Sequence, residues 1–255
     1  MYVIGIIPAR MASSRFPGKP LAEIRGIPMI GHVYHRCKMS DLLSEVYIAT
    51  CDEEIMKYAD SIGAPSVMTS ASHERATDRV AEAMQMIEKK LGTKIDVIVM
   101  IQGDEPMIYP EMIDSAVLPM QNDPGIQVVN LMSQLDSLEE HEDPNEVKVV
   151  IDQMDFALYF SREPIPSRKK GALRVPMLKQ VCIIPFRRDF LLKFNNLTPT
   201  PLEVIESIDM LRVLEHGYKV KMVMSDQRTY SVDTKEDLEY VNTYMENDTL
   251  IRMYS

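Results

Sequence analysis

Cysteine, positive charge and long apolar runs are all scarce in this sequence of 255 residues. Its three cysteines, Cys37, Cys51 and Cys182, form no close pair, which argues against a disulfide framework or a cysteine-based zinc site and favours a reducing cytoplasm. The net charge of -10 argues against a nucleic-acid-binding protein, which needs a basic surface. No apolar run approaches the ~18 residues of a membrane span, and Arg10 interrupts the short apolar start, so we expect neither a membrane segment nor a signal peptide.

The front half alternates strand and helix patterns. Continuous apolar runs, typical of strands buried on both faces, occur at 2–9, 45–51 and 96–104, and a shorter strand pattern occurs at 65–70. Amphipathic helices are expected at 28–39, 52–62, 77–92, where Gly92 should end the helix, and from Pro110 onward. This alternation predicts an α/β fold with a mostly parallel sheet and helices on both faces.

The back half is less regular. Runs at 145–152 and 156–162 predict a hairpin, 169–176 an exposed loop, and 178–186 another strand. The remaining predicted elements are a helix near 187–195, a long helix from Pro201 to about His216, a strand at 219–225 and a closing helix at 234–247. Since no linker interrupts the chain, we expect a single domain over 1–255, with the back half adding antiparallel strands to the same sheet.

Positive charge gathers in one loop despite the acidic total. Arg10, Arg15 and Lys19 follow the first strand in "IIPARMASSRFPGKPL" (6–21). Ligands of open parallel sheets bind outside the carboxyl ends of the strands, and Arg and Lys suit phosphate oxygens, so these cations predict a phosphate-bearing ligand. The loop is not a Walker P-loop, because Ser13 and Pro20 replace the glycine and the hydroxyl residue that such a loop needs. A solvated loop with scattered cations is the alternative.

Two acidic turns are expected at the same edge. Asp104 lies in "QGDEP" after the strand at 96–104, and Asp233 lies in "SVDTKEDL" before the last helix. Mg²⁺ binds one or two carboxylates together with substrate phosphates, so both are candidate ligands. A surface turn is the alternative for Asp104, and helix capping is the alternative for Asp233. His73, on the loop after the third strand, could reach the same crevice.

Taken together, "IIPARMASSRFPGKPL", "QGDEPMI", "NEVKVV", "ALYFSREPIP" and "YSVDTKEDL" resemble the 3-deoxy-manno-octulosonate cytidylyltransferases, the CMP-Kdo synthetases, over about residues 2–245. The resemblance implies a Rossmann-like nucleotidyltransferase sheet with a smaller mixed β/α extension, at about 140–200, for substrate binding and dimerisation. It also implies transfer of CMP from CTP to an acidic 3-deoxy-2-keto sugar, release of pyrophosphate, Mg²⁺ as cofactor and a homodimer.

The resemblance also assigns site residues. Those on the nucleotide side are Pro8, Ala9, Arg10, Arg15, Lys19, Thr77 and Arg79. Lys19, Asp104 and Asp233 would be catalytic, with both aspartates holding Mg²⁺. Those on the sugar side are Gln102, Arg162, Gln180, Glu206 and Asp209. Arg162 is the candidate for the acceptor's carboxylate, and a surface ion pair with Glu163 or another acid is its alternative.

The sequence departs from the family mainly on the sugar side. "HERATDR" (73–79) has Arg75 and Ala76 in place of Ser and Gly, and Gln180 replaces a His. "ESIDMLR" (206–212) has Asp209 and Met210 in place of Glu and Gln; on one continuous helix they would share a face with Glu206. These departures suggest an acceptor other than plain Kdo, such as an amino-Kdo, a related ulosonic acid or another small acid.

Two other functional classes remain open from the sequence. One is a glycosyltransferase-like enzyme that consumes a sugar nucleotide, although no Asp-x-Asp motif follows the strand at 96–104. The other is a non-catalytic nucleotide-binding protein, against which the presence of Lys19, Asp104 and Asp233 argues.

Overall fold

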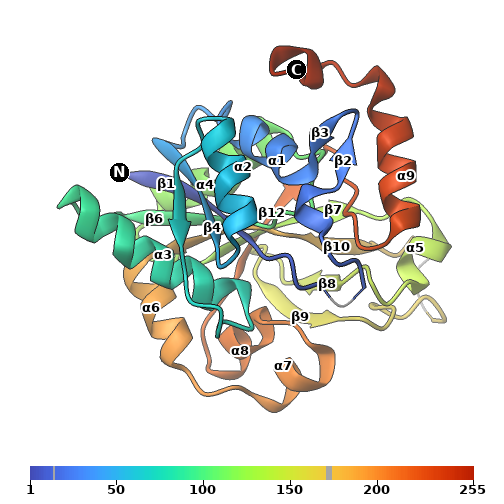
Figure 1. Ribbon diagram of the computed structural model, residues 1–255. Coiled ribbons are helices and arrows are strands. Elements are labelled where there is room, and N and C mark those ends of the chain that lie inside the picture. The colour runs from blue at the N-terminus through green and yellow to red at the C-terminus, as the bar shows by residue number, and fades with distance from the viewer. Residues whose placement is uncertain (14, 171–173) are drawn as a thin grey trace. The chain divides into compact units, whose positions relative to one another are not determined.

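The computed structural model describes residues 1–13, 15–170 and 174–255 (Figure 1). The chain forms two compact units, the first made of 1–114 and 229–255 and the second of 115–228. No helix among the described residues is both long and apolar enough to cross a bilayer. Because both ends of the chain fold into the first unit, that unit contains the basic loop and both acidic turns.

The first unit is built on parallel strands. They lie side by side in the order β6 (Val97–Ile101), β1 (Val3–Ala9), β4 (Glu45–Thr50) and β5 (Ser66–Met68). Every residue of β1 except Pro8 is buried. Since successive strand side chains point to opposite faces, the sheet is covered on both faces. The predicted mostly parallel α/β sheet is therefore confirmed.

The helices of this unit follow the predicted ranges closely. The crossover helices are α1 (Met29–Cys37), α2 (Glu53–Ser61) and α3 (Ala76–Leu91), and α9 (Lys235–Tyr244) comes from the C-terminal part. The shorter elements are η1 (Lys19–Leu21), β2 (Glu23–Ile24), β3 (Ile27–Pro28), η2 (Met245–Asn247) and η3 (Leu250–Met253). Gly92 ends α3 with a left-handed φ of 69°, as its position predicted. Helix α4 (Pro110–Asn122) then carries the chain into the second unit.

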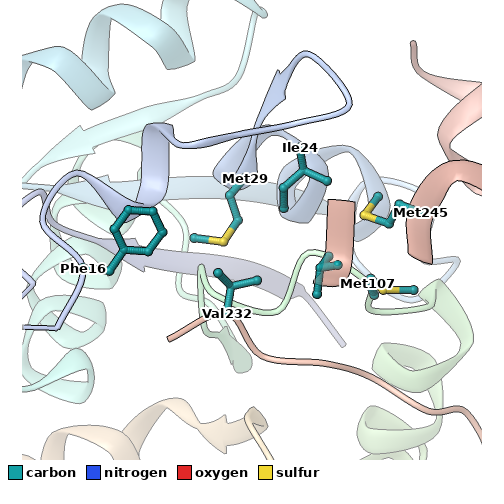
Figure 2. Close-up of a cluster of buried hydrophobic side chains, with 7 residues drawn as sticks. Phe16, Ile24, Met29, Met107, Val232 and Met245 are labelled. Carbon is teal, nitrogen blue, oxygen red and sulfur yellow. The ribbon is translucent and has the colours of Figure 1, made fainter. Parts of the chain in front are cut away.

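One apolar cluster of the first unit joins segments from both ends of the chain (Figure 2). Its buried members are Phe16, Ile24, Met29, Met107, Val232, Val241 and Met245. Phe16 belongs to the basic loop, Met107 follows Asp104 by three residues, and Val232 directly precedes Asp233. The three charged segments therefore share one hydrophobic support.

The second unit has a mixed five-stranded sheet of its own. Its order is β12 (Lys221–Ser225), β7 (Val129–Gln134), β10 (Leu178–Val181), β8 (Lys148–Ile151) and β9 (Ala157–Ser161). β12 pairs with β7 in parallel, and the other pairs are antiparallel. For these five strands the prediction that the back half extends the first sheet was wrong, because they form a sheet of their own in which β7 pairs with β12 on one edge and with β10 on the other.

The other elements of this unit partly match the predicted ranges. The hairpin is confirmed as β8 and β9. The strand expected at 178–186 is divided at Cys182 into β10 and β11 (Ile183–Arg187). The remaining helices are α5 (Leu138–Glu142), α6 (Arg188–Asn196), α7 (Pro201–Glu206) and α8 (Met210–Glu215). Part of the loop expected at 169–176 lies outside the described residues.

The long helix expected from Pro201 to His216 was wrong, because the chain breaks it into α7 and α8. Ser207 adopts a left-handed backbone with a φ of 55°. The guanidinium of Arg162 donates to the carbonyls of Glu206, at 2.7 Å, and Ser207, at 3.4 Å. These are carbonyl groups that a continuous helix would use internally. Glu206, Asp209 and Met210 therefore do not share one helical face.

The two short helices are joined by a buried ion pair. Arg212 is 1 % exposed and Glu203 is 6 % exposed. Arg212 Nε donates to Glu203 Oε2 at 2.7 Å, and Arg212 Nη2 donates to Glu203 Oε1. The pair therefore fixes α8 against α7 across the break at Ser207.

We expect Arg212→Leu to lower the free energy of unfolding by about 3–5 kcal/mol, because it leaves the carboxylate of Glu203 buried without its cation. Chemical denaturation measures the loss. The matched control is the double variant Glu203→Gln/Arg212→Leu, which removes both charges and should lose clearly less. Equal losses in the two variants would show that the charge pairing is not the cause.

Candidate active site

A cavity of about 320 Å³ opens in the first unit at the carboxyl ends of β1 and β6. The predicted residues that line it are Pro8, Ala9, Arg10, Arg15, Lys19, Arg79, Gln102, Asp104 and Asp233. The other residues that line it are Ser13, Pro20, His73, Glu74, Arg75, Ala76 and Gly103. The basic loop and both acidic turns therefore meet at one edge, as the topology argument expects.

The loop after β1 is held by backbone hydrogen bonds and by the side chain of Phe16. Gly18 N donates to the carbonyl of Met11 at 3.0 Å, and a φ of 77° at Gly18 lets the chain turn there. Met11 N donates to Asp52 Oδ2 at 2.8 Å, which ties the loop to the exit of β4. Phe16 anchors the loop in the apolar cluster. These contacts therefore hold the described parts of the loop from which Arg15 and Lys19 extend.

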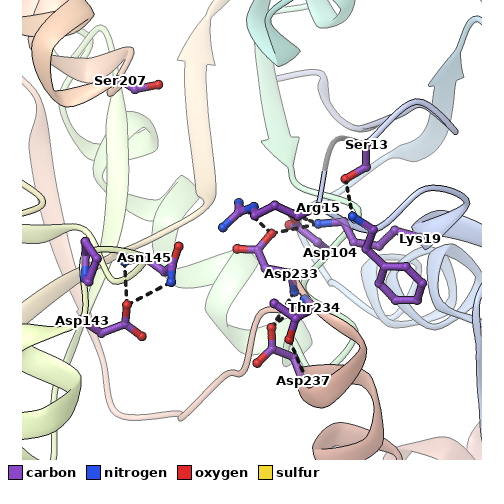
Figure 3. A network of polar contacts seen from close by, with 12 residues as sticks. Ser13, Arg15, Lys19, Asp104, Asp143, Asn145, Ser207, Asp233, Thr234 and Asp237 are labelled. Carbon is purple, nitrogen blue, oxygen red and sulfur yellow. Dashed lines mark hydrogen bonds and ion pairs between the residues drawn. The ribbon is translucent and has the colours of Figure 1, made fainter.

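Lys19 lies between the two acids (Figure 3). Its Nζ is 2.9 Å from Asp104 Oδ2 and 3.1 Å from Asp233 Oδ1. Arg15 Nη2 is also 3.1 Å from Asp233 Oδ1. The side chain of Lys19 is 12 % exposed, so these contacts are weakly screened. Two carboxylates from distant parts of the chain thus converge on one ammonium group.

Local contacts hold the two acidic turns through the backbone groups of Asp104 and Asp233 and do not use their carboxylates. Val232 N donates to the carbonyl of Asp104 at 2.9 Å, which joins the two acidic turns directly. Thr234, not Asp233, caps α9, and Asp237 completes the cap by accepting from Thr234 N at 2.8 Å. The alternative of a capping role for the Asp233 side chain is therefore excluded.

The charge of Lys19 is secured by its partners. Burial lowers the pKa of Lys19, but Asp104 and Asp233 more than offset this effect, so the pKa lies above the ordinary value of 10.5. Lys19 therefore stays cationic throughout the neutral and mildly alkaline range.

The segment before α3 forms another wall of the cavity. His73, which the sequence analysis placed near the crevice, lines the cavity, and its Nε2 lies 2.6 Å from Glu82 Oε2. Arg75 lines it too and pairs with Asp78 at 3.1 Å. Arg79 is almost fully buried and donates to Thr69, whereas Thr77 is buried and is not among the lining residues.

Sequence reasoning did not propose Ser13, Pro20 or Glu74 as site residues, although they also line the cavity. Ser13 and Pro20 lie in the same opening loop as Arg15, and Glu74 lies beside His73. Their position in those two motifs was the available signal.

The remaining sugar-side candidates lie in the second unit. The guanidinium of Arg162 donates to backbone carbonyls, including that of Pro144 at 2.7 Å. Glu206 accepts from Tyr159, Ser161 and the backbone of Arg162 at 2.8–3.2 Å. The Glu163 ion pair considered for Arg162 is absent from the ion pairs found among the described residues. Asp209 stands at the N-cap of α8.

Gln180 has a defined amide orientation. Asn130 uses its Nδ2 to donate to the carbonyls of Leu131 and Val181, at 2.9 and 2.7 Å, so its Oδ1 must accept. Gln180 Nε2 donates to that oxygen at 2.5 Å. This arrangement leaves Gln180 Oε1 as the acceptor end of the side chain.

Asp104 and Asp233 are the residues whose chemistry fits a divalent ion. Both are carboxylates that meet within hydrogen-bond distance of one cation, so this edge of the cavity already holds positive charge. No group of three or more His, Cys, Asp or Glu side chains suited to a metal was found in the described part of the chain. A site of two carboxylates needs oxygen ligands from a substrate, which is how Mg²⁺ is usually bound with phosphates.

An α/β sheet with a basic turn and two acids around one crevice is typical of enzymes that bind nucleotides at the carboxyl ends of the strands. Residues 4–224 match the family described as Cytidylyltransferase, and the chain belongs to that family. It is therefore a nucleotidyltransferase.

Two relatives show which members of this family the chain resembles. The 3-deoxy-manno-octulosonate cytidylyltransferase of Geobacter metallireducens is 45% identical over 251 residues, which cover 94% of this chain and 96% of that protein. The mitochondrial protein of the same name from Arabidopsis thaliana is 42% identical over 245 residues, covering 95% of this chain and 83% of that protein. The resemblance to this group of cytidylyltransferases is confirmed.

A solved structure agrees with these relatives. It is described as CMP:2-keto-3-deoxy-manno-octonic acid synthetase complexed with CTP. It is 36% identical, has a TM-score of 0.88, and the match covers 96% of this chain and 98% of that one. The Rossmann-like nucleotidyltransferase fold implied by the sequence resemblance is thereby confirmed.

We expect Lys19→Met to lower the free energy of unfolding by about 1–2 kcal/mol, because it removes two charged hydrogen bonds and leaves two carboxylates facing each other. The raised pKa means that this contribution is fully present below pH 10.5 and is lost only as the pH rises through the folded-state value. Urea denaturation at pH 7 and pH 9.5 should therefore give the same difference from the parent protein. A difference that shrinks between these pH values would contradict the assignment.

Proposed function

We propose that the protein transfers CMP from CTP to an acidic 3-deoxy-2-keto sugar, Kdo or a close ulosonic acid, and releases pyrophosphate. The observation that carries the proposal is the convergence of Asp104 and Asp233 on Lys19, within 3.1 Å, at the wall of the cavity. The 36% identical structure described as complexed with CTP supports the choice of nucleotide. The names of the relatives support the choice of acceptor.

In this reaction the anomeric hydroxyl of the sugar attacks the α-phosphorus of CTP, and pyrophosphate leaves in line. Phosphoryl-type transfer depends mainly on positioning and charge neutralisation. Arg10, Arg15 and Lys19 would hold the triphosphate, while Thr77 and Arg79 would lie towards the nucleoside. Arg75 adds a further cation to the cavity wall.

We propose that Asp104 and Asp233 hold Mg²⁺. The ion would neutralise phosphate charge and make the attacking hydroxyl more acidic. The fit of the two carboxylates to an ion completed by substrate phosphates supports this assignment. Lys19 would keep the two acids together and neutralised before the nucleotide binds.

Gln102 would contact the sugar from the cavity wall, and Arg162, Gln180, Glu206 and Asp209 remain proposed sugar-side residues. Gln180 favours a second candidate acceptor. Since its Oε1 is the acceptor end, it suits a donor such as a hydroxyl or an amine on the sugar. An amino-substituted ulosonic acid is therefore the acceptor to compare with Kdo.

We also propose a homodimer in the cytoplasm. Leu158 on β9 and Val204 and Ile205 on α7 are 61–75% exposed in the single chain, and a second copy would bury them. The thiols of Cys37, Cys51 and Cys182 are reduced, which suits a reducing compartment.

The substrate prediction is tested by a screen for pyrophosphate release with four nucleoside triphosphates against Kdo, an amino-substituted ulosonic acid and other acidic sugars. We expect release with CTP and a Kdo-type acid only. Tight CTP binding without product would support a non-catalytic role instead. Consumption of a CMP-sugar without release or uptake of pyrophosphate would support a glycosyltransferase.

The metal prediction concerns Asp104→Asn and Asp233→Asn. Each should lower kcat by about 100-fold, because a preorganised charge at the reacting phosphates is lost, while the melting temperature changes little. Asp60→Asn, at an exposed position of α2, is the matched control and should keep full activity. Chelation by EDTA should stop the parent enzyme, and added Mg²⁺ should restore it. Full turnover in EDTA would exclude the metal role.

The dimer prediction concerns Ile205→Glu, which places a charge where the interface would bury it. The sedimentation coefficient should therefore fall from that of a dimer to that of a monomer. Leu138→Glu is the matched control, because Leu138 is also exposed, at 58%, but lies on α5. A monomeric parent protein at micromolar concentration would refute the dimer.

A further inference from the structure

The two acidic turns are supported from below by the apolar cluster, and part of that support comes from the C-terminal segment. Met245 of η2 packs in the same cluster as Met107 and Val232 (Figure 2). Met107 belongs to the loop that follows Asp104. The end of the chain therefore contacts the acidic turns through side chains that take no part in the proposed chemistry.

A buried arginine makes this connection polar as well. Arg36 of α1 is fully buried, at 0% exposure. Its Nη1 donates to the carbonyl of Ile108 at 3.2 Å, its Nη2 pairs with Asp248 Oδ2, and its Nε donates to the hydroxyl of Tyr254 at 3.0 Å. A buried guanidinium is stable only when its donors are satisfied, so the loop after Asp104 and the C-terminal segment are both needed to hold it.

The hydrogen bonds that link Arg36, Tyr254 and His32 allow only one placement of their protons. His32 Nε2 faces the carbonyl of Ile24 at 2.7 Å, so that nitrogen must carry the hydrogen. Burial lowers the pKa of His32 to about 4, so the ring is neutral and its Nδ1 accepts from Tyr254 at 2.9 Å. The Tyr254 hydroxyl therefore donates to His32 and accepts from Arg36.

The C-terminal segment is also ordered by its own contacts. Asp248 Oδ1 accepts from Leu250 N at 2.7 Å, which starts η3. The ring of Tyr254 stacks on that of His35 with centroids 5.1 Å apart. These contacts present Asp248 and Tyr254 together to Arg36.

We propose that Arg36, Asp248 and Tyr254 form a clasp whose function is to position Asp104 for nucleotide transfer. Arg36 acts through the carbonyl of Ile108, and Ile108 N in turn donates to the carbonyl of Glu105, beside Asp104, at 3.3 Å. The three are positioning residues, since none of them lines the cavity. The inference rests on the proposed function for its catalytic readout, but the geometry of the clasp does not depend on it.

The test is Tyr254→Phe, which removes one hydroxyl and keeps the stacked ring. We expect kcat to fall about tenfold and the Mn²⁺ dissociation constant, measured by electron paramagnetic resonance with CTP present, to rise by a similar factor, as for other residues that orient a ligand-bearing side chain. The KM for CTP should stay within about twofold, because the cations of the cavity are untouched. The amides of 104–109 should exchange with deuterium faster.

Tyr240→Phe is the matched control, because Tyr240 is 52% exposed on α9 and has no contact with Arg36 among the interactions found. Asp248→Asn provides a second variant with a larger expected effect. A lower melting temperature with unchanged kcat, Mn²⁺ affinity and exchange would overturn the proposal and leave the clasp a purely structural feature. The Mn²⁺ and exchange readouts need no turnover, so they decide the proposal even if the protein fails to act on every sugar tested.

Discussion

The site of this protein depends on one electrostatic arrangement, in which Lys19 neutralises Asp104 and Asp233 together. Two carboxylates at one edge of a cavity repel each other, and burial increases the cost because water no longer screens them. The ammonium group removes that repulsion, and the acids in turn raise the pKa of Lys19. The charge trio is therefore self-consistent: the ammonium group offsets the repulsion between the two acids, and the two acids favour the protonated form of Lys19.

That arrangement is built by contacts between segments far apart in the sequence. Lys19 and Asp233 are separated by 214 positions, and Lys19 and Asp104 by 85. The backbone bond from Val232 to Asp104 and the apolar cluster bring the three segments together before any ligand is present. The cavity is thus preorganised, which lowers the cost of arranging charges during the reaction.

The sequence predicted those features that depend on local pattern and on sheet topology. Buried strands, amphipathic helices and the Gly92 cap could be predicted because residues close together in the sequence determine them. The break at Ser207 could not be predicted, because the carbonyls that it exposes, those of Glu206 and Ser207, are satisfied by Arg162, 44 and 45 residues earlier. The role of Asp233 was also ambiguous, since Asp and Thr are both common helix caps; the contact between Thr234 and Asp237 N shows that Thr234 caps α9.

The path of the chain explains why distant contacts dominate. The second unit, 115–228, is inserted between two parts of the first, so the chain must leave the first unit after Asp114 and return at Thr229. Asp233 and the cap of α9 are reached only after that return. A chain that ended before residue 229 would keep Lys19 and Asp104 but would lack the second acid, Val232 and Met245. The completed charge trio is therefore a property of the whole folded first unit, and none of its segments could hold the other two in place alone.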